Sequence, residues 1–348
     1  MAVRVSKPAF NLRSKLNELD RPVGVFGNQV LATENRYDAS KLIGGGRKNF
    51  LINGDFKISQ RGTYTSATAV TDDAYYLDRW KMRESGTAIS ITHNKNISIT
   101  EAGADGIKTN AIKIDITSSN NGYWAIRQIV EDYAAVSGQT VTFSCWVRGV
   151  GQKVFFRLWG ISNIGHGHAL TEDWQFYTET FSAPAVTGAI DGNNGFVPTI
   201  GNYAEANVYN HTADWCEVAL FQVEVGRSPT PFEFRTETEE LALCQRYYWQ
   251  VNDNKYRRVN GYKRHDTNVH FELQSPVPMR IAPAPTLSDG GIFTNFQGNF
   301  GSTQSNPTIS EWDIDTGKGL LVIESNYSST HLSIPSWEGY QLQLSAEI

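Results

Sequence analysis

Four residues in the middle of the chain have the clearest potential for ligand chemistry. Trp146, Phe155 and Trp159 carry broad ring faces on which the C–H groups of sugars can stack, and Arg157 can donate hydrogen bonds to sugar hydroxyls. We call these four residues the aromatic face. If it is exposed, it predicts contact with a glycan. If it is covered, it predicts packing against a loop, another domain or another subunit.

The placement of the aromatic face depends on a predicted β-hairpin. Its two strands, 141–147 and 154–159, alternate apolar and other residues. With a symmetric turn the apolar sides of both strands coincide, as a stable register requires. Trp146 then lies directly across from Phe155, and all four residues of the aromatic face share the side away from the core.

A metal site has weaker support in the sequence. His166 and His168 form an HGH sequence in a glycine-rich stretch, with Glu172 and Asp173 nearby. Alternate histidines can share a metal, but no third ligand here has a diagnostic spacing. The sequence therefore predicts no metal site at this position.

Catalysis also has little support. The stretch DDAYYLD carries Asp72, Asp73 and Asp78. A glycosidase needs two carboxylates at a defined separation across a sugar-binding cleft, which spacing along the chain does not establish. These residues are more simply interpreted as loop caps. The chain contains no G-x-S-x-G sequence and no phosphate-binding loop, so we expect no enzymatic activity.

Composition limits the partners and the compartment. The 348 residues have a formal net charge of −5, which argues against nucleic acid as the main partner because phosphate binding needs concentrated Lys and Arg. No apolar run approaches the roughly 20 residues that span a bilayer, and the first residues lack the apolar core of a signal peptide. The three cysteines, Cys145, Cys216 and Cys244, are scattered along apolar stretches and are expected to be buried, reduced thiols.

The elements that must position these residues are mostly strands. Apolar residues alternate with polar ones in several short runs from residue 49 onward, and loops of Gly, Asn, Ser and Thr separate the runs. This pattern predicts a mainly β protein with a β-sandwich over 47–235. Thr236 and Glu239 form a capping box that predicts a linker helix over 236–250. Further strand patterns predict a second small β-sandwich, a tip domain, over 251–348.

The first 46 residues follow a different pattern. Leu12, Leu16 and Leu19 recur at helical spacing, and a stretch with few hydrophobic residues ends in three glycines. This indicates a short helix followed by an extended arm. Such a leucine stripe needs a cover, so we expect the segment either to attach the protein to a neighbour or to pack on its own domain.

Several phrases resemble proteins of tailed bacteriophages. KPAFNLRSKLNELDRPVG resembles the start of tail-fibre-like proteins of marine and cyanobacterial phages. KNFLINGDFKISQRG, followed by YYLDRWKM, is similar to the first strands of a jelly-roll module of phage virion proteins. That module is itself distantly similar to carbohydrate-binding modules. VTFSCWVRG, WCEVALFQVEVGRSPTPFEFR and ELALCQRYY resemble its later strands and the helix that follows it.

The phrases sample residues 8–250, and the last hundred residues resemble no family. The resemblance implies a jelly-roll virion protein that forms a homotrimer, assembles in the host cytoplasm and joins other tail or head proteins by its N-terminus. In the carbohydrate-binding relatives, oxygen ligands near the positions of Asn53 and Asp55 help to hold a structural calcium. These two residues are therefore a weak calcium candidate, with turn hydrogen bonding as the alternative. No other cofactor is expected.

Three functions remain open at this point. The first is a tail fibre or receptor-binding appendage that contacts the host surface, with a surface glycan as its partner. The second is a non-adhesive adaptor, head fibre or decoration protein, which the absence of a coiled-coil or triple β-helix shaft allows. The third is an enzyme that degrades surface polysaccharide. Exposure of the aromatic face favours the first, and its burial favours the second.

Overall fold

A computed structural model gives the fold for most of the chain beyond residue 47. It describes residues 48–101, 104, 106–131, 133–151, 153–159, 163–183, 196–202, 214–251, 259–265, 268–287, 292–295, 298–300, 308–313, 315–324, 336–338 and 342–347. The chain divides into two compact units, Met1–Lys48 and Asn49–Ile348. The predicted anchoring residues Leu12, Leu16 and Leu19 lie outside the described residues, so their role stays a prediction.

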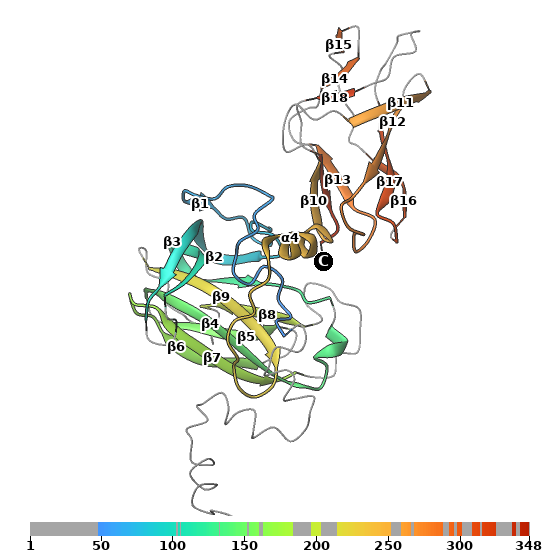
Figure 1. The fold of residues 1–348 in the computed structure, drawn as a ribbon. Helices are drawn as coiled ribbons and strands as arrows, with labels where there is room; N and C mark the ends of the chain where they lie inside the picture. The colour runs from blue at the N-terminus through green and yellow to red at the C-terminus, as the bar shows by residue number, and fades with distance from the viewer. Residues whose placement is uncertain are drawn as a thin grey trace, which may run out of the picture. The chain divides into compact units, whose positions relative to one another are not determined.

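The larger unit begins with a β-sandwich (Figure 1). Two long strands, β2 (Lys81–Ile99) and β3 (Ile107–Arg127), pair along their length and take part in both layers. In layer one, β3 is followed by β9 (Trp215–Val225), β4 (Thr140–Val150) and β7 (Gln175–Ser182). In layer two, β3 is followed by β8 (Val197–Gly201), β5 (Lys153–Trp159) and β6 (Asn163–Ala169). A short strand, β1 (Thr68–Ala69), pairs with β2.

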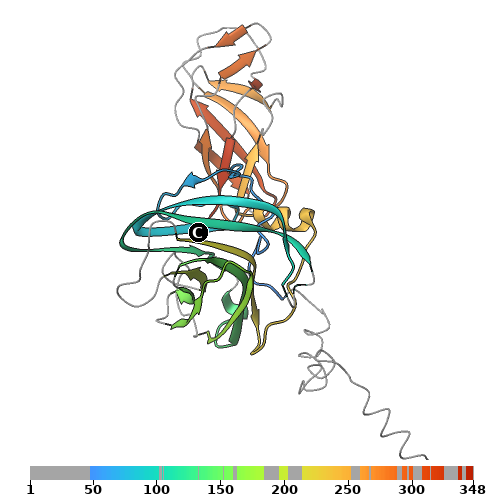
Figure 2. The same ribbon diagram turned by 90° about the vertical axis from the view of Figure 1, so that its left-hand side faces the viewer.

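The position of β3 in both layers follows from its register. Its first half, around Ile114, pairs with β9, and its last residues, around Ile126, pair with β8. Figure 2 shows the long β2–β3 pair running across the sandwich. The chain passes between layers from β4 to β5, from β6 to β7, from β7 to β8 and from β8 to β9. This alternation is that of a jelly roll, and it confirms the predicted fold class.

The core forms because the inward residues of both layers are apolar. Phe143 of β4 and Phe156 of β5 are fully buried, and their rings meet edge to face with centroids 6.1 Å apart. Trp80 and Phe221 stack 5.6 Å apart in the same cluster. Alternation with period two puts every second residue of each strand into this interior, which is why the strand patterns were readable in the sequence.

The predicted hairpin between strands 141–147 and 154–159 is wrong. β4 pairs with β7 and β9, whereas β5 pairs with β6 and β8. The chain arches from one layer to the other, so the two apolar sides face each other across the core. Matching apolar sides satisfy an arch as well as a hairpin, and the register argument does not distinguish them.

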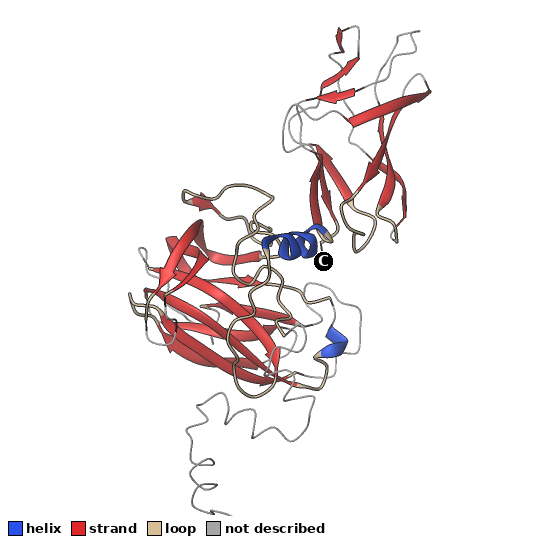
Figure 3. Ribbon diagram, in the orientation of Figure 1, coloured by secondary structure: helices blue, strands red, loops and turns tan. Residues whose placement is uncertain are grey.

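The sandwich is followed by α4 (Glu237–Gln245), which begins at the predicted capping box. Thr236 accepts a hydrogen bond from the backbone of Glu239, whose side chain accepts one from the backbone of Thr236. Among the residues that the structure describes, α4 is the one α-helix, and a short 3-10 turn spans Tyr133–Ala135 (Figure 3). Cys244 of α4 is 0% exposed, and Tyr248, which follows the helix, is 2% exposed.

The C-terminal part consists of strands, as expected. A three-stranded sheet has the order β10 (Tyr248–Val251), β19 (Leu342–Ser345), β13 (Ala284–Leu287). A second sheet has the order β15 (Gly298–Phe300), β14 (Ile292–Asn295), β18 (Ser336–Glu338), β11 (Val259–His265), β12 (Asn268–Gln274), β17 (Lys318–Glu324), β16 (Thr308–Asp313).

Residues near the C-terminus are tied to the sandwich and to α4. The Glu347 carboxylate is 6% exposed and pairs with Arg79 and, at 2.9 Å, with Arg61. The Arg79 and Arg61 guanidinium groups stack on the rings of Tyr247 and Tyr248, 3.5 and 3.7 Å from the ring centroids. This arrangement stabilises the contact between β19 and the start of the sandwich.

Two further expectations have clear outcomes. Cys145, Cys216 and Cys244 are buried free thiols, as predicted. Burial raises the pKa of the Cys145 and Cys244 thiols well above the usual value, which keeps them protonated. No helix in the described part of the chain is long and apolar enough to cross a membrane.

Candidate functional site

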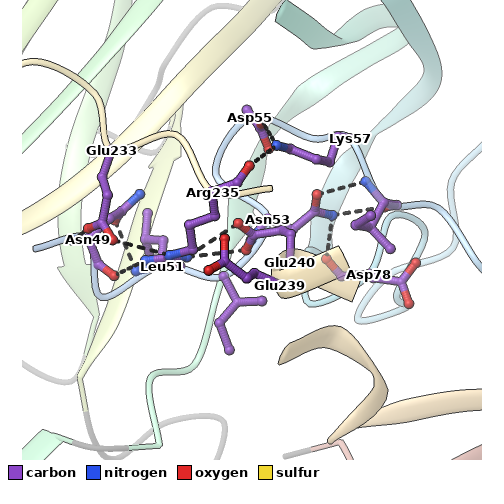
Figure 4. Close-up of polar contacts among 12 residues, drawn as sticks. Asn49, Leu51, Asn53, Asp55, Lys57, Asp78, Glu233, Arg235, Glu239 and Glu240 are labelled. Carbon is purple, nitrogen blue, oxygen red and sulfur yellow. Dashed lines mark hydrogen bonds and ion pairs between the residues drawn. The ribbon is translucent and has the colours of Figure 1, made fainter. Parts of the chain in front are cut away.

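The phrases that carry the phage resemblance meet in one buried polar network (Figure 4). Asn49 accepts hydrogen bonds from the backbones of Leu51 and Val223, both at 3.0 Å, and so joins the opening segment to β9. The Arg235 guanidinium, at the end of the closing phrase, donates to the backbone carbonyls of Asn49 at 2.6 Å and Leu51 at 3.1 Å. These residues hold the two ends of the sandwich together.

The same network reaches the helix. Glu240 of α4 is 3% exposed and accepts hydrogen bonds from Arg235 at 3.2 Å and from the backbone of Asn53. The Asn53 side chain bonds to the backbone of Ile58 in both directions and donates to the carbonyl of Asp78 at 3.0 Å. These residues of the recognisable phrases therefore make contacts that stabilise the fold, and a buried network of this kind offers no surface to a ligand.

The calcium candidate lies in this network. Asn53 is buried, and its side-chain oxygen accepts a hydrogen bond from the backbone of Ile58 at 2.9 Å. One oxygen of Asp55 pairs with Lys57 at 2.7 Å. These contacts match the alternative of turn hydrogen bonding, and calcium binding stays a prediction. Among the described residues, no three His, Cys, Asp or Glu side chains gather as a metal site.

The structure divides the aromatic face between the two layers. Trp146 points outward from layer one, where it is 6% exposed and packs in an outer hydrophobic cluster. That cluster comprises Ile99, Ala104, Ala111, Trp146, Trp174, Ala219 and Leu220. The turn between β2 and β3 supplies Ala104, and its Glu101 accepts a hydrogen bond from the backbone of Trp174 at 3.0 Å. Trp146 is therefore covered by its own chain.

The other three residues of the aromatic face lie on β5 of layer two. Phe155 is half-buried and its ring lies over Gly167 of β6, where an added Cβ would come within 2.9 Å of the ring. Arg157 is half-buried and faces Thr199 of β8, and Trp159 faces Val197. Because Trp146 belongs to layer one, these three residues do not form a single platform with it.

The remaining sequence candidates are also separated. His166 and His168 on β6 flank a carboxylate that sequence spacing did not indicate, Glu179 of β7, with nitrogen–oxygen distances of 3.0 and 3.5 Å. Glu172 and Asp173 lie in an exposed turn. The HGH sequence thus contributes contacts between the edge strands of the two layers.

The three aspartates of DDAYYLD have two different environments. Asp72 and Asp73 are exposed and pair with basic residues of β2 and β3. Asp78 is buried and accepts hydrogen bonds from the Gln60 backbone at 2.5 Å and side chain at 2.8 Å. Burial raises the pKa of Asp78 to about 6 despite these hydrogen bonds.

The outer side of layer one carries a surface that the sequence did not indicate. Lys113 of β3 and Arg148 of β4 both lie beside Glu217 of β9 in the register, and Trp215 is two residues from Glu217 on the same side. We call Lys113, Asp115, Arg148, Trp215 and Glu217 the Trp215 surface. Lys113 lies 5.2 Å and Arg148 5.9 Å from the Trp215 ring centroid.

Each cation of the Trp215 surface has a carboxylate partner. Lys113 pairs with Asp115 at 2.5 Å, and Arg148 pairs with Glu217, which also accepts a hydrogen bond from Asn94. Two positive and two negative charges therefore cancel. Arg148 and Lys113 remain partly exposed at 35% and 30%, and Trp215 is half-buried.

This arrangement is suited to sugar recognition. A partly exposed indole offers a stacking face, and the flanking charged groups offer hydrogen-bond donors and acceptors beside it. A hollow beside it is lined by Trp124, Lys153, Asn202, Asp214 and Trp215, among others. Strand alternation could have placed Trp215 and Glu217 on one side of β9. Their pairing with β3 and β4 depends on the sheet order, which the sequence does not reveal.

Comparison with known proteins gives only weak likenesses. No protein-family model and no curated protein matches the chain. The enzymatically active domain of tailspike protein 4 of bacteriophage CBA120 is 10% identical with a TM-score of 0.33, covering 51% of this chain and 21% of its own. The family 11 carbohydrate-binding module of a cellulosomal cellulase of Clostridium thermocellum is 14% identical with a TM-score of 0.27. That match covers 47% of this chain and 96% of the module.

A variant of a family 29 carbohydrate-binding module is 11% identical with a TM-score of 0.26, covering 49% of this chain and 99% of its own. The chain thus spans about a fifth of the tailspike domain but nearly the whole of each module. Similarity at this level does not assign a family or a function, so the functional conclusion depends on the geometry of the chain itself.

Proposed function

We propose that the protein is a non-enzymatic subunit of a bacteriophage virion appendage, such as a tail fibre, whose sandwich contacts a host-surface glycan through the Trp215 surface. The phage context comes from the sequence phrases at both ends of the sandwich. The observation that carries the binding role is the partly exposed Trp215 ring between Lys113 and Arg148. Charge balance on this surface favours an uncharged sugar over an acidic one.

Calorimetric titration of the full chain with neutral oligosaccharides prepared from host envelopes tests the binding role. We expect measurable binding that Trp215→Ala weakens by at least about tenfold and that Phe176→Ala keeps. Phe176 is a matched control because it is an exposed aromatic residue of the same layer, 44% exposed. Equal binding by both variants would remove the Trp215 surface from the proposal.

The virion role has a separate test. We propose that residues 1–46 attach the protein to the particle through Leu12, Leu16 and Leu19, and that the protein is a homotrimer. A fragment that begins at Asn49 should be absent from particles when it replaces the full chain. Light scattering should give three times the 38.8 kDa chain mass. Normal incorporation of the fragment, or a stable monomer at micromolar concentration, would contradict these two points respectively.

These tests also separate the alternative function. A non-adhesive adaptor, head fibre or decoration protein would still depend on residues 1–46 for incorporation. It would show no glycan binding for the Trp215 variant to lose. The two measurements together therefore distinguish the appendage that binds the host from the structural component.

A further inference from the structure

A second polar surface, on β2 and β3, has an excess of positive charge. Lys81 and Arg127 lie directly opposite each other in the register, and Arg83 is two residues along the same side of β2. All three side chains meet one carboxylate. Asp73 lies 2.9 Å from Lys81, 3.1 Å from Arg83 and 2.7 Å from Arg127. We call these four residues, with Asp72, the Asp73 cluster.

Such an arrangement has an electrostatic cost that an anion relieves. Like charges directly opposite on adjacent strands destabilise a sheet. Asp72 adds one more carboxylate, 3.2 Å from Arg83. Three cations against two carboxylates leave a net charge of +1, whereas the Trp215 surface has two of each and is neutral. Burial lowers the pKa of the Arg127 guanidinium, Asp73 opposes that effect, and Arg83 adds to it.

The exposure of the five side chains shows which of them a ligand can reach. The two carboxylates, Asp72 and Asp73, are 41% and 44% exposed. The cations beneath them are less accessible, at 25% for Arg83, 11% for Lys81 and 2% for Arg127. The three cationic side chains, of which Arg127 is the most buried, are thus covered by the side chains of Asp72 and Asp73 from the solvent side. An incoming anion can take their place without opening the core.

The Asp73 side chain can leave the three cations without a movement of the backbone. Its φ angle of +64° lies in the left-handed region, which is unfavourable for residues other than glycine although Asp and Asn tolerate it best. Backbone hydrogen bonds of Asp73 to Met82 and of Met82 to Ala74 hold the loop, both at 2.9 Å. The backbone is therefore fixed, and only the Asp73 side chain needs to move.

The neighbouring side chains favour a small ligand with polar groups. The Tyr123 hydroxyl lies 3.4 Å from Arg83, and Lys81 lies 5.4 Å from the centroid of the Tyr75 ring. The Arg61 guanidinium lies 5.1 Å from the same centroid. An aromatic ring and a phenol beside the three cations of the cluster suit a sugar that carries one acidic group. The chain's net charge of −5 disfavours a long polyanion.

We infer that the Asp73 cluster is a binding site for the carboxylate or sulfate group of an acidic sugar, which displaces the Asp73 side chain from Lys81, Arg83 and Arg127. The site is distinct in place and in ligand charge from the Trp215 surface. It does not depend on the function proposed for that surface. Bidentate pairing with a guanidinium favours planar carboxylates, and Lys81 contributes a compact charge.

Titration of the full chain with sodium D-glucuronate, sodium sulfate and D-glucose, at constant ionic strength, tests this inference. Glucuronate and sulfate should bind, and glucose should not. Asp73→Asn removes the competing charge and keeps a residue that tolerates the left-handed backbone, so anion affinity should rise about tenfold. Arg83→Gln should abolish it. Stronger binding of glucuronate than of sulfate would identify a uronic acid as the source, and the reverse a sulfated sugar.

Asp313→Asn is the matched control, because Asp313 is an exposed aspartate that accepts hydrogen bonds from Thr316 in a turn, so this variant removes one negative charge from the chain outside both the Asp73 cluster and the Trp215 surface. It should leave anion affinity unchanged, and so should Trp215→Ala, which separates a failure here from a failure of the proposed function. Equal anion affinity in the wild type and Asp73→Asn would overturn the inference. Binding by Asp73→Asn alone would also overturn it, because Asp73 would then be a permanent part of the cluster.

Discussion

Two tryptophans on the outer side of layer one, Trp146 and Trp215, differ in how far their rings are exposed. Trp146 of β4 is covered by the turn between β2 and β3 and by Trp174, and it is 6% exposed. Trp215, on the neighbouring strand β9, stays partly exposed between two cations. Both follow the same alternation away from the core. The difference teaches that a distant turn decides whether an outward aromatic residue stabilises the fold or remains available to a ligand.

The strongest test of this comparison is the stability of Trp146→Ala. Truncation of a buried tryptophan leaves a cavity, so the free energy of unfolding should fall by about 3–5 kcal/mol. Urea unfolding of the purified chain measures it, with Phe176→Ala as a control that should cost much less because its ring is 44% exposed. Wild-type stability combined with lost glycan binding would instead restore Trp146 to the binding surface.

The comparison also marks what the sequence could predict. Period-two alternation predicted the sandwich and the apolar interior, and the capping box at Thr236 predicted the start of α4. These signals act over a few residues. The order of strands in the sheets does not, because β4 and β5 are adjacent in sequence and yet lie in opposite layers. The predicted hairpin failed for this reason, and Trp146 lies in a different layer from the other three residues of the aromatic face.

The candidate site depends on the same missing information. Lys113, Arg148 and Glu217 come from three strands that are adjacent only in layer one. The phage-like phrases, in contrast, are short and carry their own hydrogen-bond partners, as Asn49 and Arg235 illustrate. The phrases that are easily recognised in this chain thus encode structural contacts. The Trp215 surface, in contrast, is brought together by the order of strands in the sheet.

A pH experiment separates folding from binding, because Asp78 and His93, two buried groups whose pKa values are shifted to about 6 and about 4, belong to neither the Trp146 cluster nor the Trp215 surface. Burial raises the pKa of Asp78 from 3.8 to about 6, so the folded state holds this proton more tightly than the unfolded state. The stabilising contribution is therefore fully present below pH 3.8 and is lost as the pH rises through 6. It amounts to about 3 kcal/mol.

Burial of His93 has the opposite sign. It lowers the pKa from 6.5 to about 4, and nearby Lys95 lowers it further. That contribution is present above pH 6.5 and is lost as the pH falls toward 4. We expect the two effects to offset each other between pH 4 and 6. Asp78→Asn should remove one of them, so the stability of this variant relative to the wild type should improve by about 3 kcal/mol from pH 4 to pH 7. Urea unfolding at both pH values measures this difference. The same difference in the free energy of unfolding between Asp78→Asn and the wild type at pH 4 and at pH 7 would contradict this assignment.

The binding half of the comparison is tested by Trp215→Ala. Loss of the stacking face should weaken glycan binding by at least about tenfold, which corresponds to roughly 1.4 kcal/mol. The free energy of unfolding should change less than in Trp146→Ala, because the Trp215 ring is less buried than the Trp146 ring. When both quantities are measured on both variants, the free energy of unfolding should fall mainly in Trp146→Ala and the glycan affinity mainly in Trp215→Ala. A loss of stability in Trp215→Ala as large as in Trp146→Ala would mean that both rings serve the fold.

The smallest expected effect concerns the charge beside the ring. Lys113→Met keeps an unbranched aliphatic side chain at this position and removes the ammonium, which lies 5.2 Å from the Trp215 ring centroid and is already paired with Asp115. Exposed ion pairs and exposed cation–π contacts each contribute up to about 1 kcal/mol. Affinity for a neutral oligosaccharide should therefore fall only about two- to fivefold. The same titration with an acidic oligosaccharide gives the contradicting outcome, because a hundredfold loss of affinity in Lys113→Met would show that Lys113 binds a negative charge on that ligand. The Trp215 surface would then take an acidic sugar, and it would not differ in ligand charge from the Asp73 cluster.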